Sequence, residues 1–198
     1  MSTLLKPLQV RADLIRRATS VFSGQDFERM YRVTKFRAKY FLEEYTKAGL
    51  FIRLKRGLYA LHDQLPSEEE IANVLYRPSY LSFEYALAAY AVLPEMVYAV
   101  TSATSKSSRT FVVEEKTYTY STIKQGAFTG YGPIKRDNRT ILMAEPEKAL
   151  VDYLYFVSLG KRTSSDRLAL AKLDRTKVLQ YARLYRRKGL EQLVRELL

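Results

Sequence analysis

The sequence predicts an α+β fold of two domains, and three observations support this prediction. Stretches with helical periodicity fill most of residues 8–49, and two short apolar runs follow them. The segment Asp63–Pro66 then interrupts this pattern with polar residues and a proline. Beyond it, β-rich runs of alternating character lie among further helical stretches. We therefore expect an N-terminal domain over residues 1–64 and a C-terminal mixed α/β domain over residues 65–198, in which helices flank a small sheet.

Two amphipathic helices are expected at the start of the chain. The first is Leu8–Thr19, whose inward-facing residues are Val10, Leu14 and Ala18. The second is Gly24–Tyr31, which Ser23 can cap because its hydroxyl can accept a hydrogen bond from a first-turn N–H. A short turn at Arg32 and Val33 then leads to a third helix.

The third helix begins after Thr34, whose hydroxyl can act as a cap in the same way. Its apolar face is formed by residues at helical spacing, namely Ala38, Phe41, Leu42 and Tyr45. The cations near its N-terminal end fall off that face; they are Lys35, Arg37 and Lys39. Gly49 stands where a helix can end in a left-handed residue. The first turns of this helix are therefore expected to present a basic surface.

A basic hairpin is expected directly after the third helix. Leu50–Leu54 and Leu58–Leu61 are short apolar strands, and Lys55, Arg56 and Gly57 form a positively charged turn between them. Three helices followed by such a hairpin are typical of a winged helix-turn-helix domain, which places its third helix in a DNA groove. The residues expected to contact DNA are Thr34, Lys35, Phe36, Arg37, Lys39, Tyr40, Lys55 and Arg56. The alternative is a solvated basic helix beside an ordinary hairpin.

The net charge of +12 is unevenly distributed along the chain. Residues 1–62 hold 13 Lys and Arg against 5 Asp and Glu, residues 63–160 hold 9 against 12, and residues 161–198 hold 11 against 4. Two basic ends favour a polyanionic partner, because cations that neutralise phosphates release counterions. A membrane surface is disfavoured, since the basic segments lack the large apolar face of an interfacial helix. Double-stranded DNA is the expected partner, with a second contact from Lys172, Arg175, Lys177, Arg183, Arg186, Arg187 and Lys188.

Composition argues against several other classes of protein. The chain has no cysteine, so disulfides and thiolate metal sites are excluded, and His62 has no second histidine with which to share a metal. No metal or cofactor is therefore expected. No apolar run is long enough to span a bilayer, and the first residues do not have the pattern of a signal peptide. A cytoplasmic protein is expected.

The C-terminal domain is expected to begin with a helix that runs to about Leu75, because Ser67 and Glu70 can form a capping box. Further helices are expected over Ser82–Val92, from Pro146 to Leu159, from Asp174 to Lys188 and after Gly189. Strands are expected over Val97–Thr101, Arg109–Val113, Thr117–Ile123 and Thr140–Met143, the middle two as a hairpin. A loop punctuated by Gly126, Gly130 and Gly132 is expected before the last strand.

An enzymatic site in this domain would draw on Glu84, Glu145, Glu147, Lys148 and Asp152. Metal-dependent nucleases place an acid and a lysine at alternate positions of a strand, whereas Glu147 and Lys148 are adjacent at a helix start. Acids there more simply favour the positive end of the helix dipole. Lys148 can pair with Asp152 four residues later, or Asp152 can pair with another basic residue in the core. We therefore expect no enzymatic activity and no catalytic residues.

The order of several segments resembles the AbiEi family, the antitoxins of AbiE-type toxin–antitoxin systems. The resemblance is carried by Leu58–Leu61 after the Arg56–Gly57 turn, and by three longer runs. These runs are YRPSYLSFEYALAAYAVLPE from Tyr76 to Glu95, VTSATSKSSRTF from Val100 to Phe111, and AEPEKALVDYLYF from Ala144 to Phe156. Most of the chain is covered, as far as Tyr181.

The resemblance implies an antitoxin of a phage-defence system, with a winged-helix transcriptional repressor domain that binds inverted repeats in the operator DNA of its own operon. It also implies a C-terminal antitoxin domain that counteracts a nucleotidyltransferase-like toxin. Two alternatives stay open. One is a winged-helix regulator with an unrelated effector domain, and the other is a metal-dependent nuclease.

Overall fold

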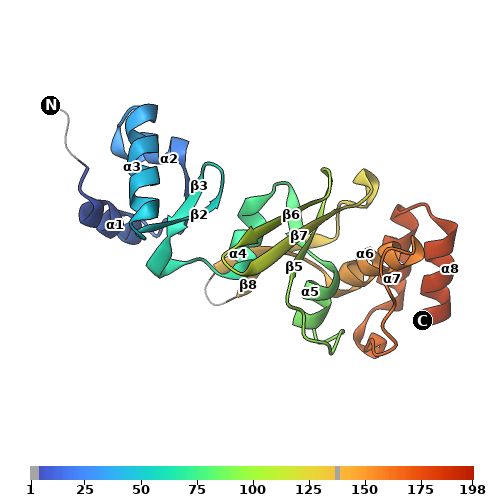
Figure 1. Cartoon of the computed structure of the whole chain (residues 1–198). Coiled ribbons are helices and arrows are strands. Elements are labelled where there is room, and N and C mark those ends of the chain that lie inside the picture. Colours follow the sequence, from blue (N-terminus) through green and yellow to red (C-terminus); the bar gives the residue numbers. More distant parts are fainter. Residues whose placement is uncertain (1–4, 137–138) are drawn as a thin grey trace. The chain divides into compact units, whose positions relative to one another are not determined.

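The computed structural model describes residues 5–136 and 139–198 and has a mixed α+β fold, as predicted (Figure 1). The chain divides into two compact units, Met1–Leu75 and Tyr76–Leu198. Each unit contains helices and a sheet of its own. None of the described helices combines the length and apolar character that crossing a bilayer requires.

The first unit ends later in the chain than residue 64, the boundary that the sequence predicts. The helix α4 (Glu68–Leu75) packs against β2 (Phe51–Lys55) and groups with the first unit. Its predicted capping box is confirmed, because the Ser67 N–H donates to Glu70 Oε2 (3.0 Å) and the Glu70 N–H donates to Ser67 Oγ (3.3 Å). The expected helix is therefore present, and its packing ties it to the residues before it.

The first unit contains three further helices and a small antiparallel sheet. The helices are α1 (Pro7–Arg16), α2 (Gly24–Tyr31) and α3 (Lys35–Lys47). The sheet has the order β1-β3-β2 and is formed by β1 (Val21–Ser23), β2 and β3 (Leu58–Leu61). The expectation that the first helix continues to Thr19 is wrong, because Ala18 has a left-handed φ of 50°. Strand β1 was not predicted, since three residues are too few to show a period.

Aromatic side chains form the core of the first unit. Phe22 of β1 lies edge-on to Phe51 of β2 with ring centroids 5.6 Å apart, and Phe27 of α2 stacks on Phe41 of α3 at 5.4 Å. All four side chains are buried. Burial of one such side chain stabilises a fold by about 1.5–3 kcal/mol. These contacts therefore hold α3 firmly against α2 and the sheet.

The described residues of the second unit build a six-stranded sheet in the order β6-β7-β5-β4-β9-β8. Its strands are β4 (Ser79–Leu81), β5 (Val100–Thr104), β6 (Arg109–Val113), β7 (Lys116–Thr122), β8 (Tyr131–Arg136) and β9 (Arg139–Ala144). The antiparallel pair β6–β7 is the predicted hairpin. The expectation of a loop at Gly132 is wrong, because Gly132 lies within β8 and pairs with Met143. Strand β8 was therefore not predicted, and neither was β4, which is as short as β1.

The helices of the second unit are α5 (Phe83–Ala89), α6 (Pro146–Ser158), α7 (Arg175–Leu184) and α8 (Lys188–Leu197). Helix α6 packs against α5, α7 and α8, which gather around it (Figure 1). It begins at Pro146, as predicted, and Gly160 follows its end with a φ of 67°. The expected helix from Asp174 to Lys188 is interrupted, because Arg186 has a left-handed φ of 45°.

Candidate nucleic-acid interface

Two exposed aromatic residues of helix α3, Phe36 and Tyr40, lie on the side opposite the core and are called the aromatic crest below. The cap is as predicted, since Thr34 Oγ1 accepts from the Arg37 N–H (3.4 Å) and the helix begins at Lys35. At about 3.6 residues per turn, Phe36 and Tyr40 lie opposite the buried face that Ala38, Phe41 and Leu42 form. Phe36 is 79% exposed and Tyr40 is 65% exposed. The most outward part of the first turns is therefore apolar.

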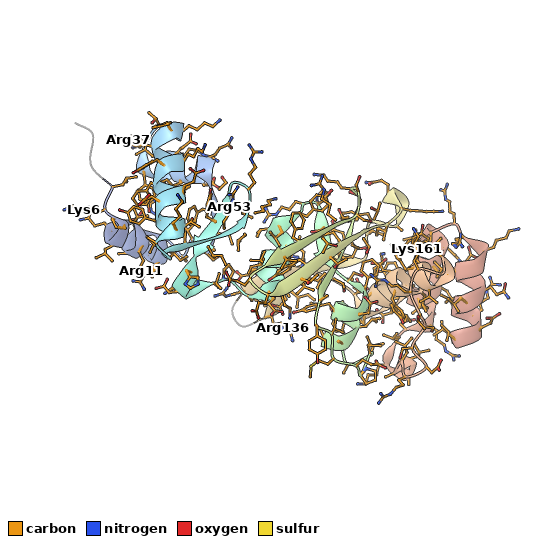
Figure 2. All side chains as sticks on the ribbon, in the orientation of Figure 1. Lys6, Arg11, Arg37, Arg53, Arg136 and Lys161 are labelled. Carbon is orange, nitrogen blue, oxygen red and sulfur yellow. The ribbon has the colours of Figure 1, made fainter. Side chains whose placement is uncertain are left out.

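Cations lie on both flanks of this crest. Lys35 and Lys39 line a hollow that α3 shares with the β2–β3 hairpin, and Arg37 lines a second hollow on the other side, beside Leu5 and Tyr45. Figure 2 shows Arg37 on α3 and Arg53 on β2. The surface of the first two turns thus consists of an apolar centre with a positive edge on each side.

Charge changes sign along α3. Residues 32–42 contain no Asp or Glu, whereas Glu43 and Glu44 follow directly. Lys39 Nζ lies 4.0 Å from Glu43 Oε1, and both side chains are mostly exposed, so the attraction between them is weak. The helix dipole adds positive potential at the N-terminal end. The basic end of the helix is therefore the end suited to an anionic partner.

The hollow between α3 and the hairpin has a volume of about 480 Å³. Its cationic lining residues are Lys35, Lys39, Arg53 and Arg56, and its acidic ones are Glu28 and Glu43. The start of α2 borders it, and the Gly24 N–H donates to the Gly57 carbonyl (3.2 Å), which fixes the hairpin turn beside α2. The hairpin and the basic end of α3 thus contribute to one surface.

The turn of the hairpin lies where the sequence predicts it, between Lys55 and Leu58. Gly57 has a φ of 77°, and a Cβ atom added there would meet nothing within 4 Å, so the backbone angle alone disfavours other residues. The pairing register of β2 and β3 shifts between Arg53 and Lys55. Arg56 is exposed at the turn. Lys55 is half-buried, and its Nζ donates to the Leu75 carbonyl of α4 at 2.5 Å. The two cations of the turn therefore differ in their availability to a ligand.

Arg53 was not among the predicted contacts, although it lines the same hollow. It is the exposed position in a strand whose neighbours Ile52 and Leu54 are buried. A single cation within the apolar run Leu50–Leu54 was the signal in the sequence that could have identified it.

The predicted secondary basic residues are distributed over η3 (Leu170–Lys172), α7 and the start of α8. Two of them have structural partners. Lys177 Nζ lies 3.2 Å from Glu145 Oε2, and Arg187 donates to the Ser158 carbonyl (2.8 Å) and Oγ (3.1 Å) at the end of α6. The exposed members are Lys172, Arg175, Lys177, Arg183, Arg186 and Lys188. Because α7 ends at Leu184, Arg183 is the one predicted tail cation in its last turn.

Each acidic residue that an enzymatic site could use has a hydrogen-bond or ion-pair partner in the second unit. Glu145 accepts from Lys177 Nζ and from the Tyr181 hydroxyl (3.1 Å), and burial together with this hydrogen bond raises the pKa of Tyr181 to about 12. Glu147 Oε1 accepts from the Asp174 N–H at the start of α7 (3.2 Å). Glu84 pairs with Arg162. These carboxylates thus connect separate segments of the second unit.

Lys148 and Asp152 form the predicted ion pair, and both side chains are completely buried. Asp152 Oδ2 also accepts from the hydroxyls of Tyr80 (3.0 Å) and Ser82 (2.7 Å), and Asp152 Oδ1 accepts from that of Tyr185. Burial lowers the pKa of Lys148, and the adjacent carboxylate opposes this shift. Among residues 5–136 and 139–198, no cluster of three or more His, Cys, Asp or Glu side chains is placed to hold a metal.

The chain was also compared with known proteins. No protein-family model matches it, and a search of the curated proteins finds no match.

Proposed function

We propose that the first unit is a winged helix-turn-helix domain that binds double-stranded DNA, with α3 in the major groove and the β2–β3 hairpin on the adjacent backbone. The observation that carries this proposal is the shared basic surface. Cations from the first turns of α3 and from the hairpin line one hollow, although they are separated in the sequence. Four cations against two acids leave this hollow with a positive charge, which favours an anionic partner.

The dimensions and charges of α3 suit a DNA groove. A major groove about 12 Å wide admits one α-helix, and helix N-terminal residues are the ones that reach base edges in helix-turn-helix proteins. Lys35 and Lys39 on one flank and Arg37 on the other can each approach a phosphate wall. Glu43 and Glu44 lie one turn further along, where the helix leaves the groove. The N-terminal end of α3, which has no acidic residue, is thus the end that enters the major groove.

The connection between α2 and α3 supports this proposal. Arg32 has a left-handed φ of 50°, which ends α2, and Thr34 then caps α3. Phe27 and Phe41 lock the two helices together at 5.4 Å. A helix fixed in this way reaches its ligand with little loss of conformational entropy.

The resemblance to the AbiEi family supports a more specific role. We propose a cytoplasmic antitoxin that represses its own operon by binding inverted repeats, while its second unit counteracts a nucleotidyltransferase-like toxin. A regulator with an unrelated effector domain would share the DNA-binding surface. Co-expression with the neighbouring gene separates these two functions, because only an antitoxin restores growth to cells that make the toxin.

Fluorescence anisotropy with the full chain tests DNA binding. The probes are a duplex from the region upstream of the gene and an unrelated duplex of equal length. We expect both to bind and the upstream duplex to bind at least about a thousandfold more tightly, as specific sites do. Lys39→Ala or Arg37→Ala should cost about 1–3 kcal/mol if the side chain contacts a base. Glu44→Gln is the matched control, and it should not weaken binding. No binding by the wild-type chain, or unchanged binding by both variants, would remove α3 as the reading helix.

A further inference from the structure

Phe36 and Tyr40 form an exposed aromatic pair one helical turn apart. Phe36 is 79% exposed and Tyr40 is 65% exposed, although aromatic rings of this size are strongly favoured in cores. Neither ring takes part in the aromatic contacts found in the described residues, which join Phe22, Phe27, Tyr31, Phe41, Tyr45, Phe51 and Tyr59 in the first unit. Contiguous apolar groups left in water are typical of a binding surface.

The surroundings of the pair define the chemistry of its partner. Lys35 and Lys39 lie on one side of the crest, and Arg37 lies on the other. Residues 32–42 contain no carboxylate, and the acids that line the two hollows are Glu28, Glu43 and Glu44. The matching surface has an apolar centre between two anionic edges. The major groove has this arrangement where it contains thymine, because the thymine C5-methyl lies on the groove floor and phosphates line both sides.

We propose that Phe36 and Tyr40 read thymine methyl groups in the major groove. This inference rests on the proposed DNA binding and names the sequence feature that the same surface selects. A phenyl ring has no hydrogen-bond donor or acceptor, so Phe36 can distinguish bases only by apolar contact. Cytosine lacks the methyl group and presents an amino donor instead. Phe36 therefore favours thymine over cytosine at the position that it covers.

The spacing of the two rings predicts the spacing of the thymines. Four residues of helix rise by about 6 Å, and consecutive bases of one strand are separated by about 3.4 Å along the duplex. Phe36 and Tyr40 therefore cover positions about two base pairs apart. Phe36 is the second residue of α3, which places it among the N-terminal residues that contact base edges. We expect preferred sites to contain a pair of thymines at this separation.

The test uses a duplex that the full chain selects from a randomised pool, and a second duplex in which deoxyuridine replaces every thymidine. Deoxyuridine pairs like thymidine and lacks only the methyl group. The wild-type chain should bind the uracil duplex about fourfold less tightly for each methyl group that it contacts. Phe36→Ala should bind the thymine duplex less tightly than the wild-type chain does. The ratio of its affinities for the thymine and uracil duplexes should decrease by the same factor as its affinity for the thymine duplex. The preference for the thymine duplex should disappear in the Phe36→Ala/Tyr40→Ala double variant.

Leu8→Ala is the matched control. Leu8 is 77% exposed and lies on α1, so its removal deletes an equally exposed apolar group from another helix. This variant should keep the full dependence on the methyl groups. Comparison between variants cancels any effect of uracil on the duplex itself. Unchanged circular dichroism melts should accompany all variants, because the altered side chains are exposed.

The outcomes separate this inference from the DNA-binding proposal. Failure of the wild-type chain to bind any duplex overturns both. Binding that is equal for thymine and uracil duplexes, with wild-type affinity retained by Phe36→Ala, overturns methyl recognition and leaves DNA binding intact. Loss of toxin neutralisation by Phe36→Ala, with DNA binding unchanged, also overturns it and assigns the crest to a protein partner. A uracil penalty that depends on Phe36 supports the inference.

Discussion

The two cations of the hairpin turn have different roles, although both carry the same charge. Lys55 and Arg56 are adjacent cations, yet Lys55 Nζ donates to the Leu75 carbonyl and Arg56 is exposed. A backbone carbonyl near the C-terminal end of α4 carries partial negative charge, which favours a cation there. Lys55 thus connects β2 to α4. Arg56 has a planar guanidinium that can contact two phosphate oxygens at once.

Alanine substitution should separate these two roles. Arg56→Ala should lower the slope of log affinity against log salt by about one, because one phosphate contact is lost. Lys55→Ala should leave that slope unchanged and lower the free energy of unfolding by about 1 kcal/mol, the value of a hydrogen bond. Anisotropy titrations at several salt concentrations and urea unfolding of the full chain measure both quantities. The reverse pattern, with Lys55 alone setting the slope, would contradict this division.

At the scale of elements, buried polar groups join the helices of the second unit to its sheet. Asp152 of α6 accepts hydrogen bonds from Tyr80 of β4, from Ser82 and from Tyr185, which follows α7. A buried carboxylate needs such donors, since transfer of its charge from water is costly. The network therefore fixes α6 against the sheet and fixes the end of α7 against α6.

Removal of either partner of the buried ion pair should destabilise the second unit unequally. Asp152→Ala should cost about 3–5 kcal/mol, because it leaves the Lys148 charge buried without an anion. Lys148→Met should cost less, since Asp152 keeps the hydroxyl donors of Tyr80, Ser82 and Tyr185. Urea unfolding of the full chain, followed by near-ultraviolet circular dichroism, measures both. Equal losses would show that the hydroxyl groups do not stabilise the carboxylate.

The basic segment around α7 and α8 should provide a contact without sequence preference. Arg183, Arg186 and Lys188 are exposed, whereas Arg187 is held by Ser158 and should stay unchanged. Reversal of the three exposed charges to Glu should weaken binding to both duplexes by about tenfold at low salt, because phosphate contacts are not specific to sequence. Toxin neutralisation should persist. Lost neutralisation with intact DNA binding would instead assign these cations to the protein partner.

Across the whole molecule, features that depend on neighbouring residues could be predicted from the sequence, whereas features that depend on distant segments could not. Ser23, Thr34 and Ser67 cap helices as expected, because a cap depends on residues three positions away. Strands β1 and β4 were missed because each has three residues and depends on pairing with distant segments. The position of Lys55 against α4 is likewise a tertiary contact.

The candidate interface follows the same rule. The cations of α3 were identified from helical spacing, which fixes the face of a helix. Arg53 was missed, since its place beside Lys35 and Lys39 depends on how the hairpin packs against α3. The break at Arg186 was missed because a left-handed backbone angle at an arginine has no compositional signal. The outward position of Phe36 and Tyr40 follows from their spacing along the helix. The proposal that they contact DNA bases follows from the cations on either side of them.

The central claim is that the basic end of α3 and the hairpin together bind DNA. The most direct test is the salt dependence of DNA affinity for the Lys35→Ala/Lys39→Ala/Arg56→Ala variant. The slope of log affinity against log salt should decrease in magnitude by about 2–3, because each lost phosphate contact contributes about 0.9. A matched variant removes three exposed cations of the second unit that lie outside α7 and α8, namely Lys135, Lys161 and Arg167, and should keep the wild-type slope. An unchanged slope in the first variant, or an equal decrease in both, would contradict the claim.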